Sequence, residues 1–290
     1  MKIGIHTPDK KFPNLALMKL SAYHKAKGDS VSWYEPLFNH ADIIYSSKVF
    51  NYSHDDPYLP PDAIKGGTGY DLKNKLSDEI DRMCPDYSIY PFNDKSYGYL
   101  TRGCPNKCSW CIVPEKEGGI RAYMDIDDIL CGKKKVVLMD NNVLAHDHGL
   151  EQIEKMIRLG IKVDFNQGLD ARIIADNSDI AELLSKLRWL KPLRMACDTK
   201  SQMKHIEKAT SLLRKFGTTP SNYFVYVLVK DIPDALERVN FLKKLKLDPF
   251  AQPYRDFDNN ILPSVEQKRF ARWVNHKAIF KTVEYKNYVP

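Results

Sequence analysis

Three cysteines, Cys104, Cys108 and Cys111, lie within a span of eight positions, in a loop that follows a short β-like run. Thiolates this close in a chain of intracellular character usually share a metal ion or an iron–sulfur cluster. A structural zinc site and a closed four-iron cluster each need four protein ligands. Three thiolates would leave one iron of a four-iron cluster open, so the spacing C-x3-C-x2-C predicts a metal site that also binds a small molecule.

With Trp110 directly before the last cysteine, this loop resembles the signature of radical S-adenosylmethionine (SAM) enzymes. The resemblance implies that the three cysteines hold a [4Fe–4S] cluster whose open iron binds the amino and carboxylate groups of SAM. One electron then breaks a carbon–sulfur bond of SAM, and the resulting 5′-deoxyadenosyl radical abstracts a hydrogen atom from the substrate. The cofactor carries this chemistry and the protein positions it. A low-potential electron donor of the flavodoxin or ferredoxin type is then an expected partner.

The remaining cysteines, Cys84, Cys131 and Cys197, are scattered along the chain. Their spacing favours buried apolar thiols over a disulfide framework. No apolar run reaches the roughly 18–20 residues needed to span a bilayer. The N-terminus lacks the apolar region of a signal peptide and is typical of a first strand. The sequence therefore predicts a cytoplasmic protein with no membrane partner.

The first 93 residues predict a small, open, Rossmann-like α/β domain with a connector. A helix over 14–27, ended by Gly28, lies between strands expected at 2–6, 30–34 and 41–45. With Phe12–Ala16 opening the helix, this region resembles the cobalamin-binding-like domain of one branch of radical SAM enzymes. The D-x-H-x-x-G motif that ligates cobalt is missing, which argues against bound cobalamin. In the connector, Gly66–Tyr70 is either a flexible turn or a close-approach loop for an anion.

From residue 94 to residue 290 the chain alternates strand and helix patterns. Six β-prone runs are expected to form strands, at 97–101, 135–139, 161–165, 193–197, 223–229 and 250–254. Repeated βα units imply a parallel sheet curling toward a barrel, and six units predict a partial (β/α)6 TIM-type barrel. The family resemblance implies the same fold.

In βα barrels the active site lies at the carboxyl ends of the strands. Polar residues follow every predicted strand, and they include Arg102, Asp140, Asn141, Asn142, Asn166, Gln167, Asp170, Arg172, Asp198, Lys200, Lys230, Asp231, Tyr254 and Arg255. Carboxylates, amides and cations of this kind suit a zwitterionic cofactor that carries a ribose. The sequence therefore predicts the SAM site at this edge.

Individual roles follow from the resemblance. Asp140, Asn141 and Asn142 stand where the family carries a Gly-Gly-Glu-like motif for the methionine amino group, although both glycines are absent. The segment around Trp110 is expected to meet adenine, or the ring has a packing role. Asp198 is expected at the ribose, Arg172 or Lys200 at the SAM carboxylate, with Gln167 nearby. Tyr254 and Arg255 are expected to face the substrate or to close the adenine pocket.

The sequence does not name the substrate. The continuation Ile112-Val113-Pro114 is similar to the cluster loop of tRNA methylthiotransferases, but only Cys84 precedes residue 94, so the cysteines of a second cluster are absent. A nucleoside, a nucleic acid, a peptide or a metabolite remains open. In a different class, the chain would be a non-enzymatic iron–sulfur or zinc protein that binds nucleic acid through its basic tail from Lys268, in which aromatic residues are interleaved. The same tail equally predicts an amphipathic helix whose aromatics dock on the body; a net charge of +7 does not decide between them.

Overall fold

A computed structural model describes residues 1–217, 220, 222–256, 259 and 261–289 of the chain. Contacts divide the chain into two compact units. The N-terminal unit comprises residues 1–98 and 127–133, and the C-terminal unit comprises residues 99–126 and 134–290. The short segment 127–133 thus leaves the C-terminal unit after the cysteine loop and returns to the N-terminal one.

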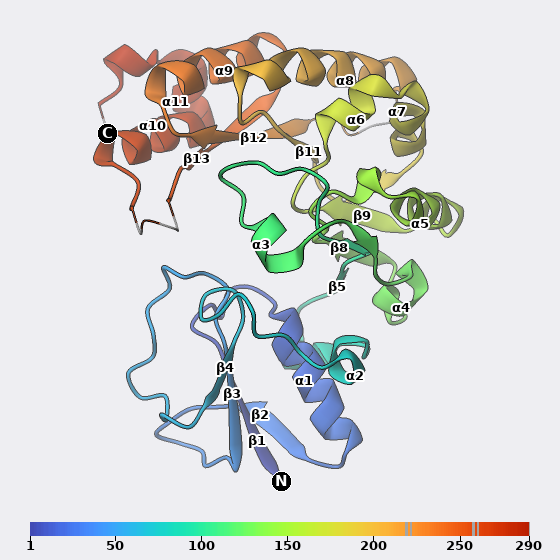
Figure 1. Ribbon diagram of the computed structural model, residues 1–290, viewed down its shortest axis with the longest axis vertical. Helices are drawn as coiled ribbons and strands as arrows, with labels where there is room; N and C mark the ends of the chain where they lie inside the picture. Colours follow the sequence, from blue (N-terminus) through green and yellow to red (C-terminus); the bar gives the residue numbers. More distant parts are fainter. Residues whose placement is uncertain (218–219, 221, 257–258, 260, 290) are drawn as a thin grey trace. The chain divides into compact units, whose positions relative to one another are not determined.

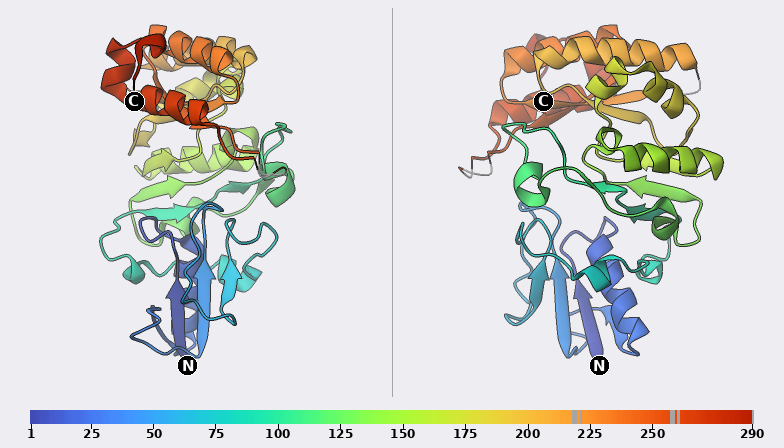
Figure 2. Two further views of the ribbon diagram at one scale, coloured as in Figure 1. Left: turned by 90° about the vertical axis from the view of Figure 1, so that its left-hand side faces the viewer. Right: turned by 45° about the vertical axis from the view of Figure 1, so that its right-hand side comes forward.

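The N-terminal unit is built on a four-stranded parallel sheet in the order β2-β1-β3-β4 (Figures 1 and 2). Its elements are β1 (Lys2–His6), α1 (Leu15–Ala26), β2 (Ser30–Trp33), β3 (Ile43–Ser47), β4 (Ile64–Gly66), α2 (Asp78–Asp81), the 3-10 turn η1 (Tyr87–Ile89) and β5 (Ser96–Gly98). Asn14 begins α1 by accepting a hydrogen bond from the Leu17 N–H at 3.2 Å. Ile5 packs in a buried cluster with Leu17. The predicted open Rossmann-like layer is confirmed.

Strand β4 was not predicted, because its three residues lie in a stretch rich in Asp and Pro and become a strand only by pairing with β3. The glycine loop behind it is a turn: the N–H of Tyr70 donates to the carbonyl of Gly67 at 3.0 Å. Gly67 has φ +89°, and a Cβ there would lie 2.6 Å from the Lys48 carbonyl oxygen. The close backbone approach that glycine permits therefore serves the chain itself.

In the C-terminal unit, strands that pair in parallel alternate with helices along the chain. Its elements are β6 (Thr101–Arg102), α3 (Val113–Glu117), β7 (Arg121–Ala122), β8 (Lys135–Leu138), η2 (Val143–Ala145), α5 (Asp147–Arg158), β9 (Lys162–Phe165), α6 (Ala171–Asp176), α7 (Ser178–Ser185), β10 (Arg188–Trp189), β11 (Leu193–Ala196), η3 (Lys200–Gln202), α8 (Met203–Phe216), β12 (Tyr223–Val229), α9 (Ile232–Lys244), β13 (Asp248–Pro253), α10 (Val265–Asn275), α11 (Lys277–Thr282) and η4 (Tyr285–Asn287). Helix α4 (Ile126–Leu130) begins at the border of the two units.

Parallel pairing joins β8 to β9, β9 to β10, β11 to β12 and β12 to β13. An isolated parallel bridge between Leu169 and Met195 continues the wall from the end of β9 to β11. Helices α8 and α9 run along one side of β11 and β12 (Figure 1). Each strand that follows one of these helices runs parallel to the strand before the helix, as the predicted α/β class with repeated βα units requires.

The first predicted barrel strand, 97–101, is interrupted: β5 ends at Gly98 and β6 begins at Thr101. Strand β6 instead pairs antiparallel with β7, so the cysteine loop closes as a hairpin. Helices α3, α6 and α11 were not predicted; each has only five or six residues, too few for a helical period to stand out. Helix α8 ends as predicted, with Gly217 left-handed at φ 78°.

Cys84 and Cys131 form a disulfide inside the N-terminal unit, with their Cα atoms 5.9 Å apart across 47 residues of sequence. For this pair the prediction of buried apolar thiols was wrong: Cys84 is exposed and Cys131 is half-buried. The pairing depends on the return of segment 127–133, which no local pattern reveals. For Cys197 the prediction is confirmed, and burial raises the pKa of its thiol to about 12.

The aromatic residues of the tail pack against one another. The Trp273 ring lies 5.0 Å from Phe280 between centroids, and Trp273, Phe280 and Tyr288 are buried. The amide of Asn275 exchanges two hydrogen bonds with the backbone of Ala251 in β13. Docking on the body is therefore the confirmed prediction, and these rings are not presented for base stacking. None of the described helices combines the length and apolarity needed to cross a membrane.

Candidate functional site: the cysteine loop and the strand ends

The cysteine loop is fixed at its base by backbone geometry. Thr101 pairs with Ala122 across the β6–β7 hairpin. Gly103 has φ +81°, and a Cβ at this position would lie 2.2 Å from the carbonyl oxygen of Gly119. Only glycine fits there without displacement of the backbone. The position directly before Cys104 is therefore set by a close crossing of the two strands of the hairpin.

A buried carboxylate, Glu117, holds the same base together. Its oxygens accept from Arg102 at 2.9 Å, from the Gly103 N–H at 3.1 Å and from the Asn141 amide at 3.1 Å. The Glu117 side chain is 6 % exposed. Asn141, predicted to bind the cofactor, is thus held against the loop. Sequence reasoning missed Glu117, because nothing in the stretch Pro114–Gly119 distinguishes it from a surface residue.

Asp140, at the end of β8, has a similar task. Its carboxylate accepts from the Leu100 N–H at 3.2 Å, the Thr101 N–H at 2.6 Å and the Thr101 hydroxyl at 2.8 Å. Burial raises the pKa of the Asp140 carboxyl to about 6, against the lowering effect of these bonds. The residue thus anchors the start of β6 with the same oxygens that were expected to meet the methionine ammonium.

Asp170 joins three segments at the strand ends. Its Oδ2 atom accepts from the amide of Asn106 in the cysteine loop and from the amide of Asn142 after β8, each at 3.1 Å. Arg172 adds a two-pronged ion pair at 2.8 and 2.7 Å. Burial raises the pKa of Asp170, but the bonds from Arg172 and Asn106 outweigh it and the pKa lies below its usual value. Asp170 is therefore a charged carboxylate that connects the cysteine loop, the segment after β8 and the start of α6 by hydrogen bonds.

Asn142 lies directly beside the first cysteine. Its amide nitrogen is 3.8 Å from the Cys104 sulfur. The side chain is 3 % exposed, and its Oδ1 atom accepts no hydrogen bond from the described part of the chain. A buried acceptor without a donor is costly unless a bound group supplies one. This atom is an unfilled hydrogen-bonding position next to the cysteines.

The three thiols are free and close enough to influence one another. The pKa of Cys108 is raised, mainly by burial and next by the charge of Cys111, while Arg172 opposes the shift. Desolvation also raises the pKa of Cys111. The donor set fits a three-thiolate cluster with one open iron. Among the described residues no three His, Cys, Asp or Glu side chains are gathered closely enough to hold a metal ion.

The other predicted residues differ in their surroundings. Asp198 accepts from the Leu228 N–H at 2.9 Å, and burial raises the pKa of its carboxyl. Lys200 is exposed and pairs with Glu237 at 2.5 Å. Gln167 is exposed. The structure thus brings Asp198 into a buried strand end, whereas Lys200 is engaged at the surface.

Lys230, after β12, joins the last strand end to the cysteine loop. Its ammonium lies 4.1 Å from the centre of the Tyr254 ring and 5.2 Å from that of Trp110. Arg255 follows Tyr254 and is half-buried. Trp110 and Tyr254 are therefore brought together by a cation that sequence reasoning named only as a polar strand end.

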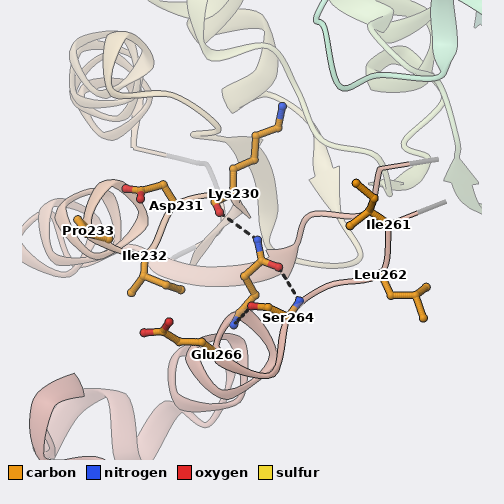
Figure 3. A pocket seen from close by; sticks show the side chains of 9 residues that line it. Lys230, Asp231, Ile232, Pro233, Ile261, Leu262, Ser264 and Glu266 are labelled. Atoms are coloured by element: carbon orange, nitrogen blue, oxygen red, sulfur yellow. Dashed lines mark hydrogen bonds between the residues drawn. The ribbon is translucent and has the colours of Figure 1, made fainter. Parts of the chain in front are cut away.

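A cavity of about 500 Å³ adjoins this point, lined by Lys230, Asp231, Ile232, Pro233, Ile261, Leu262, Ser264, Glu266 and Gln267. Figure 3 shows the Lys230 side chain extending away from Ser264 and Glu266. Gln267 donates to the Lys230 carbonyl at 3.0 Å and accepts from the Ser264 N–H at 2.8 Å. The polar floor of this cavity is thus satisfied internally.

Comparison with known proteins bears on this arrangement. No family model matches the chain. The tRNA-2-methylthio-N(6)-dimethylallyladenosine synthase of Clostridium novyi is 23% identical over 267 residues, which cover 87% of this chain and 56% of that protein. The bacteriochlorophyllide d C-12(1)-methyltransferase of Chlorobaculum tepidum is 27% identical over 173 residues, 49% of this chain and 37% of that one.

Among solved structures, the cobalamin-dependent SAM radical enzyme OxsB, with aqua-cobalamin and SAM bound, matches with a TM-score of 0.54. The match covers 97% of this chain and 56% of OxsB at 14% identity. The relatives and this neighbour are radical SAM enzymes. The chain is thus similar to radical SAM enzymes in sequence and in fold.

The match to OxsB confirms the predicted fold class, an N-terminal Rossmann-like α/β unit followed by a partial barrel. The relatives are enzymes, and this likeness supports an enzyme that uses SAM and a [4Fe–4S] cluster. The chain spans about half the length of the C. novyi relative and of OxsB. Activities and substrates of these longer proteins therefore apply to this chain only as proposals.

Proposed function

We propose that Cys104, Cys108 and Cys111 ligate a [4Fe–4S] cluster and that the protein uses SAM to abstract a hydrogen atom from its substrate. The observation that carries this proposal is the pairing of three free thiols with the unfilled acceptor of buried Asn142 beside them. When bound, the cluster would supply the electron that cleaves SAM. The chain's own residues hold and orient the reactants.

The roles of the side chains follow from their surroundings. Asn142 Oδ1 can accept a hydrogen bond from the methionine ammonium. Arg172 donates hydrogen bonds from Nε and Nη2 to Asp170. None of the described residues accepts from its Nη1 atom, so the N–H groups of Nη1 can donate to the SAM carboxylate. Lys200 is a weaker candidate, because Glu237 already pairs with it. Asp198 is proposed at the ribose.

The remaining predicted residues belong to the substrate side. Trp110 and Tyr254, joined by Lys230, are proposed to flank the adenine or the substrate, with Arg255 beside them. Gln167 is retained as an exposed contact at the same edge. Asp140 and Asn141 are proposed to act on the cofactor through the loop that they hold.

We propose that the N-terminal unit does not take cobalamin, although OxsB contains it. In parallel α/β sheets a ligand sits at the carboxyl edge where the strand order reverses, here between β1 and β3. That edge is filled by the chain: His6 contacts Ser46 at 2.9 Å and Asp56 at 3.2 Å. Lys48 pairs with Asp55 at 2.6 Å. Among the described residues of this edge these side chains already pair with one another, and the D-x-H-x-x-G motif is missing from the sequence.

For the substrate and for the reaction after hydrogen abstraction, we propose only broad classes. One relative acts on tRNA by its name and another on a bacteriochlorophyllide, which supports a transferase-type or other radical modification of a nucleoside, a nucleic acid or a small molecule. A flavodoxin- or ferredoxin-type reductant and a cytoplasmic location remain parts of the proposal. The non-enzymatic nucleic-acid binder is disfavoured by the burial of the tail aromatics.

The test is anaerobic reconstitution with iron and sulfide, followed by dithionite and SAM. The proposal expects about four irons per chain and release of 5′-deoxyadenosine. Four irons without any cleavage of SAM would favour an electron-transfer protein instead. For cobalamin, titration of the purified chain with aquacobalamin should leave the absorption spectrum of the corrin unchanged; a saturable spectral shift would refute the cobalamin proposal alone.

A further inference from the structure

Asp170 is placed to control the shape of the cysteine loop. Asn106, its partner in that loop, lies between Cys104 and Cys108. Asn142, its partner after β8, also reaches the Cys104 sulfur. One carboxylate oxygen therefore restrains Cys104 from both sides, through two different segments of the C-terminal unit.

The restraint is well built. Asp170 is 12 % exposed, and its other oxygen accepts from the Arg172 side chain and, as the N-cap of α6, from the Arg172 N–H at 3.1 Å. Hydrogen bonds to a charged acceptor are stronger than those between neutral groups. A loop ordered before it binds pays less conformational entropy when it binds. Since no metal cage is preformed among the described residues, this order is what the loop can contribute in advance.

We propose that Asp170 is a positioning residue that orders the cysteine loop of the metal-free protein through Asn106 and Asn142, and so sets how firmly a cluster is retained. The inference rests on the proposed function for its second half only. Its first half concerns the chain without metal and stands or falls by itself.

The test uses the full chain and two substitutions that break the same contact. Asp170→Ser keeps a good N-cap for α6 but cannot reach Asn106 or Asn142. Asn106→Ala removes the other partner without changing any charge, so it excludes an effect of charge on thiol ionisation. The matched control is Asn177→Ser, the N-cap of α7, which accepts from the Asp179 N–H at 2.9 Å and, among the described residues, is not hydrogen-bonded to the cysteine loop.

The first measurement is the rate of iodoacetamide alkylation of each cysteine in metal-free protein, read by mass spectrometry. Both test variants should alkylate Cys104 about fivefold faster, as expected when hydrogen bonds of this strength are lost. Buried Cys197 serves as the internal standard, because general loosening would expose it too. The double variant should match Asp170→Ser, since that substitution already removes the hydrogen bond to Asn106. An unchanged Cys104 rate in Asn106→Ala, or an equal rise at Cys197, would overturn the proposal.

The second measurement is the rate of iron loss to a chelator after reconstitution, which should rise about fivefold in both variants and stay unchanged in Asn177→Ser. Faster alkylation with unchanged iron loss would overturn the second half of the proposal. Failure of the wild-type chain to bind four irons would instead refute the proposed function, while the alkylation result would still decide the ordering role of Asp170.

Discussion

The two units both have a sheet edge with polar residues, but the hydrogen bonding of these residues differs between the units. Each has a parallel sheet whose strands run into polar residues. In the N-terminal unit those residues satisfy one another, as His6 with Ser46 and Lys48 with Asp55. In the C-terminal unit buried Asn142 keeps an unfilled acceptor beside free thiols. The comparison teaches that a polar strand end indicates a ligand site only where its hydrogen bonding is left incomplete.

If this comparison is right, substitutions fall into two classes. Residues that complete the internal bonding should affect stability, and residues beside the unfilled acceptor should affect binding. Four predictions test the distinction, in order of decreasing effect.

Glu117→Ala should destabilise the C-terminal unit by about 3–5 kcal/mol, because it leaves the partly buried Arg102 and the Gly103 N–H without their acceptor. Chemical denaturation measures the loss. The control is Glu182→Ala, which removes an exposed i,i+4 pair with Lys186 and should change stability by less than about 1 kcal/mol. Equal effects of the two substitutions would show that Glu117 is not structurally engaged.

Lowering the pH should act in opposite directions on the two units. Burial raises the pKa of Asp140 to about 6, so the native C-terminal unit takes up a proton more readily than the unfolded chain and gains up to about 3 kcal/mol as the pH falls from 6 toward 3.8. Burial lowers the pKa of His6, so the N-terminal unit loses stability as the pH falls below 6.5.

Hydrogen exchange of peptides from each unit, in wild type and in Asp140→Asn and His6→Gln, isolates these contributions from those of other groups. Each substitution should remove the contribution of its own group to the acid dependence, and only in the unit that holds that group. If Asp140→Asn leaves the C-terminal unit with the same acid response, the pKa assignment is wrong.

Gly103→Ala should destabilise the loop and lower iron binding more than Gly118→Ala does. Both glycines have positive φ, +81° and +73°, which L side chains rarely adopt, so both substitutions should cost about 1–3 kcal/mol of backbone strain. Only at Gly103 does the new methyl meet a neighbour, the Gly119 carbonyl oxygen; no atom lies within 4 Å of it at Gly118. Equal iron content in the two variants would contradict the close crossing at the base of the loop.

Arg172→Ala should weaken SAM binding to the reconstituted protein by about tenfold or more, since a hydrogen bond to a charged group is lost. Lys200→Ala should change it by less than about twofold, because Lys200 is exposed and paired with Glu237. Equilibrium dialysis with labelled SAM measures both. A larger effect of Lys200→Ala than of Arg172→Ala would indicate that Lys200 binds the SAM carboxylate.

The sequence predicted the elements that carry a strong local pattern. Strand β12 was predicted at its observed bounds, because its run of β-branched and aromatic residues has no competing signal. The cysteine loop was found by spacing alone, and Asp170 was placed at the correct strand end. What escaped prediction depends on contacts between distant residues: Asn106 meets Asp170 across 64 positions, and Cys84 meets Cys131 across 47. No periodicity encodes such pairings.

The proposed function requires that Cys104, Cys108 and Cys111 together hold the cluster that cleaves SAM. The most direct measurement compares iron content and 5′-deoxyadenosine release of the reconstituted wild-type chain with those of Cys104→Ala, with Cys197→Ala as the control for a cysteine outside the loop. We expect about four irons and product for the wild type and the control, and loss of both in Cys104→Ala. Cluster content and SAM cleavage that survive in Cys104→Ala would contradict it.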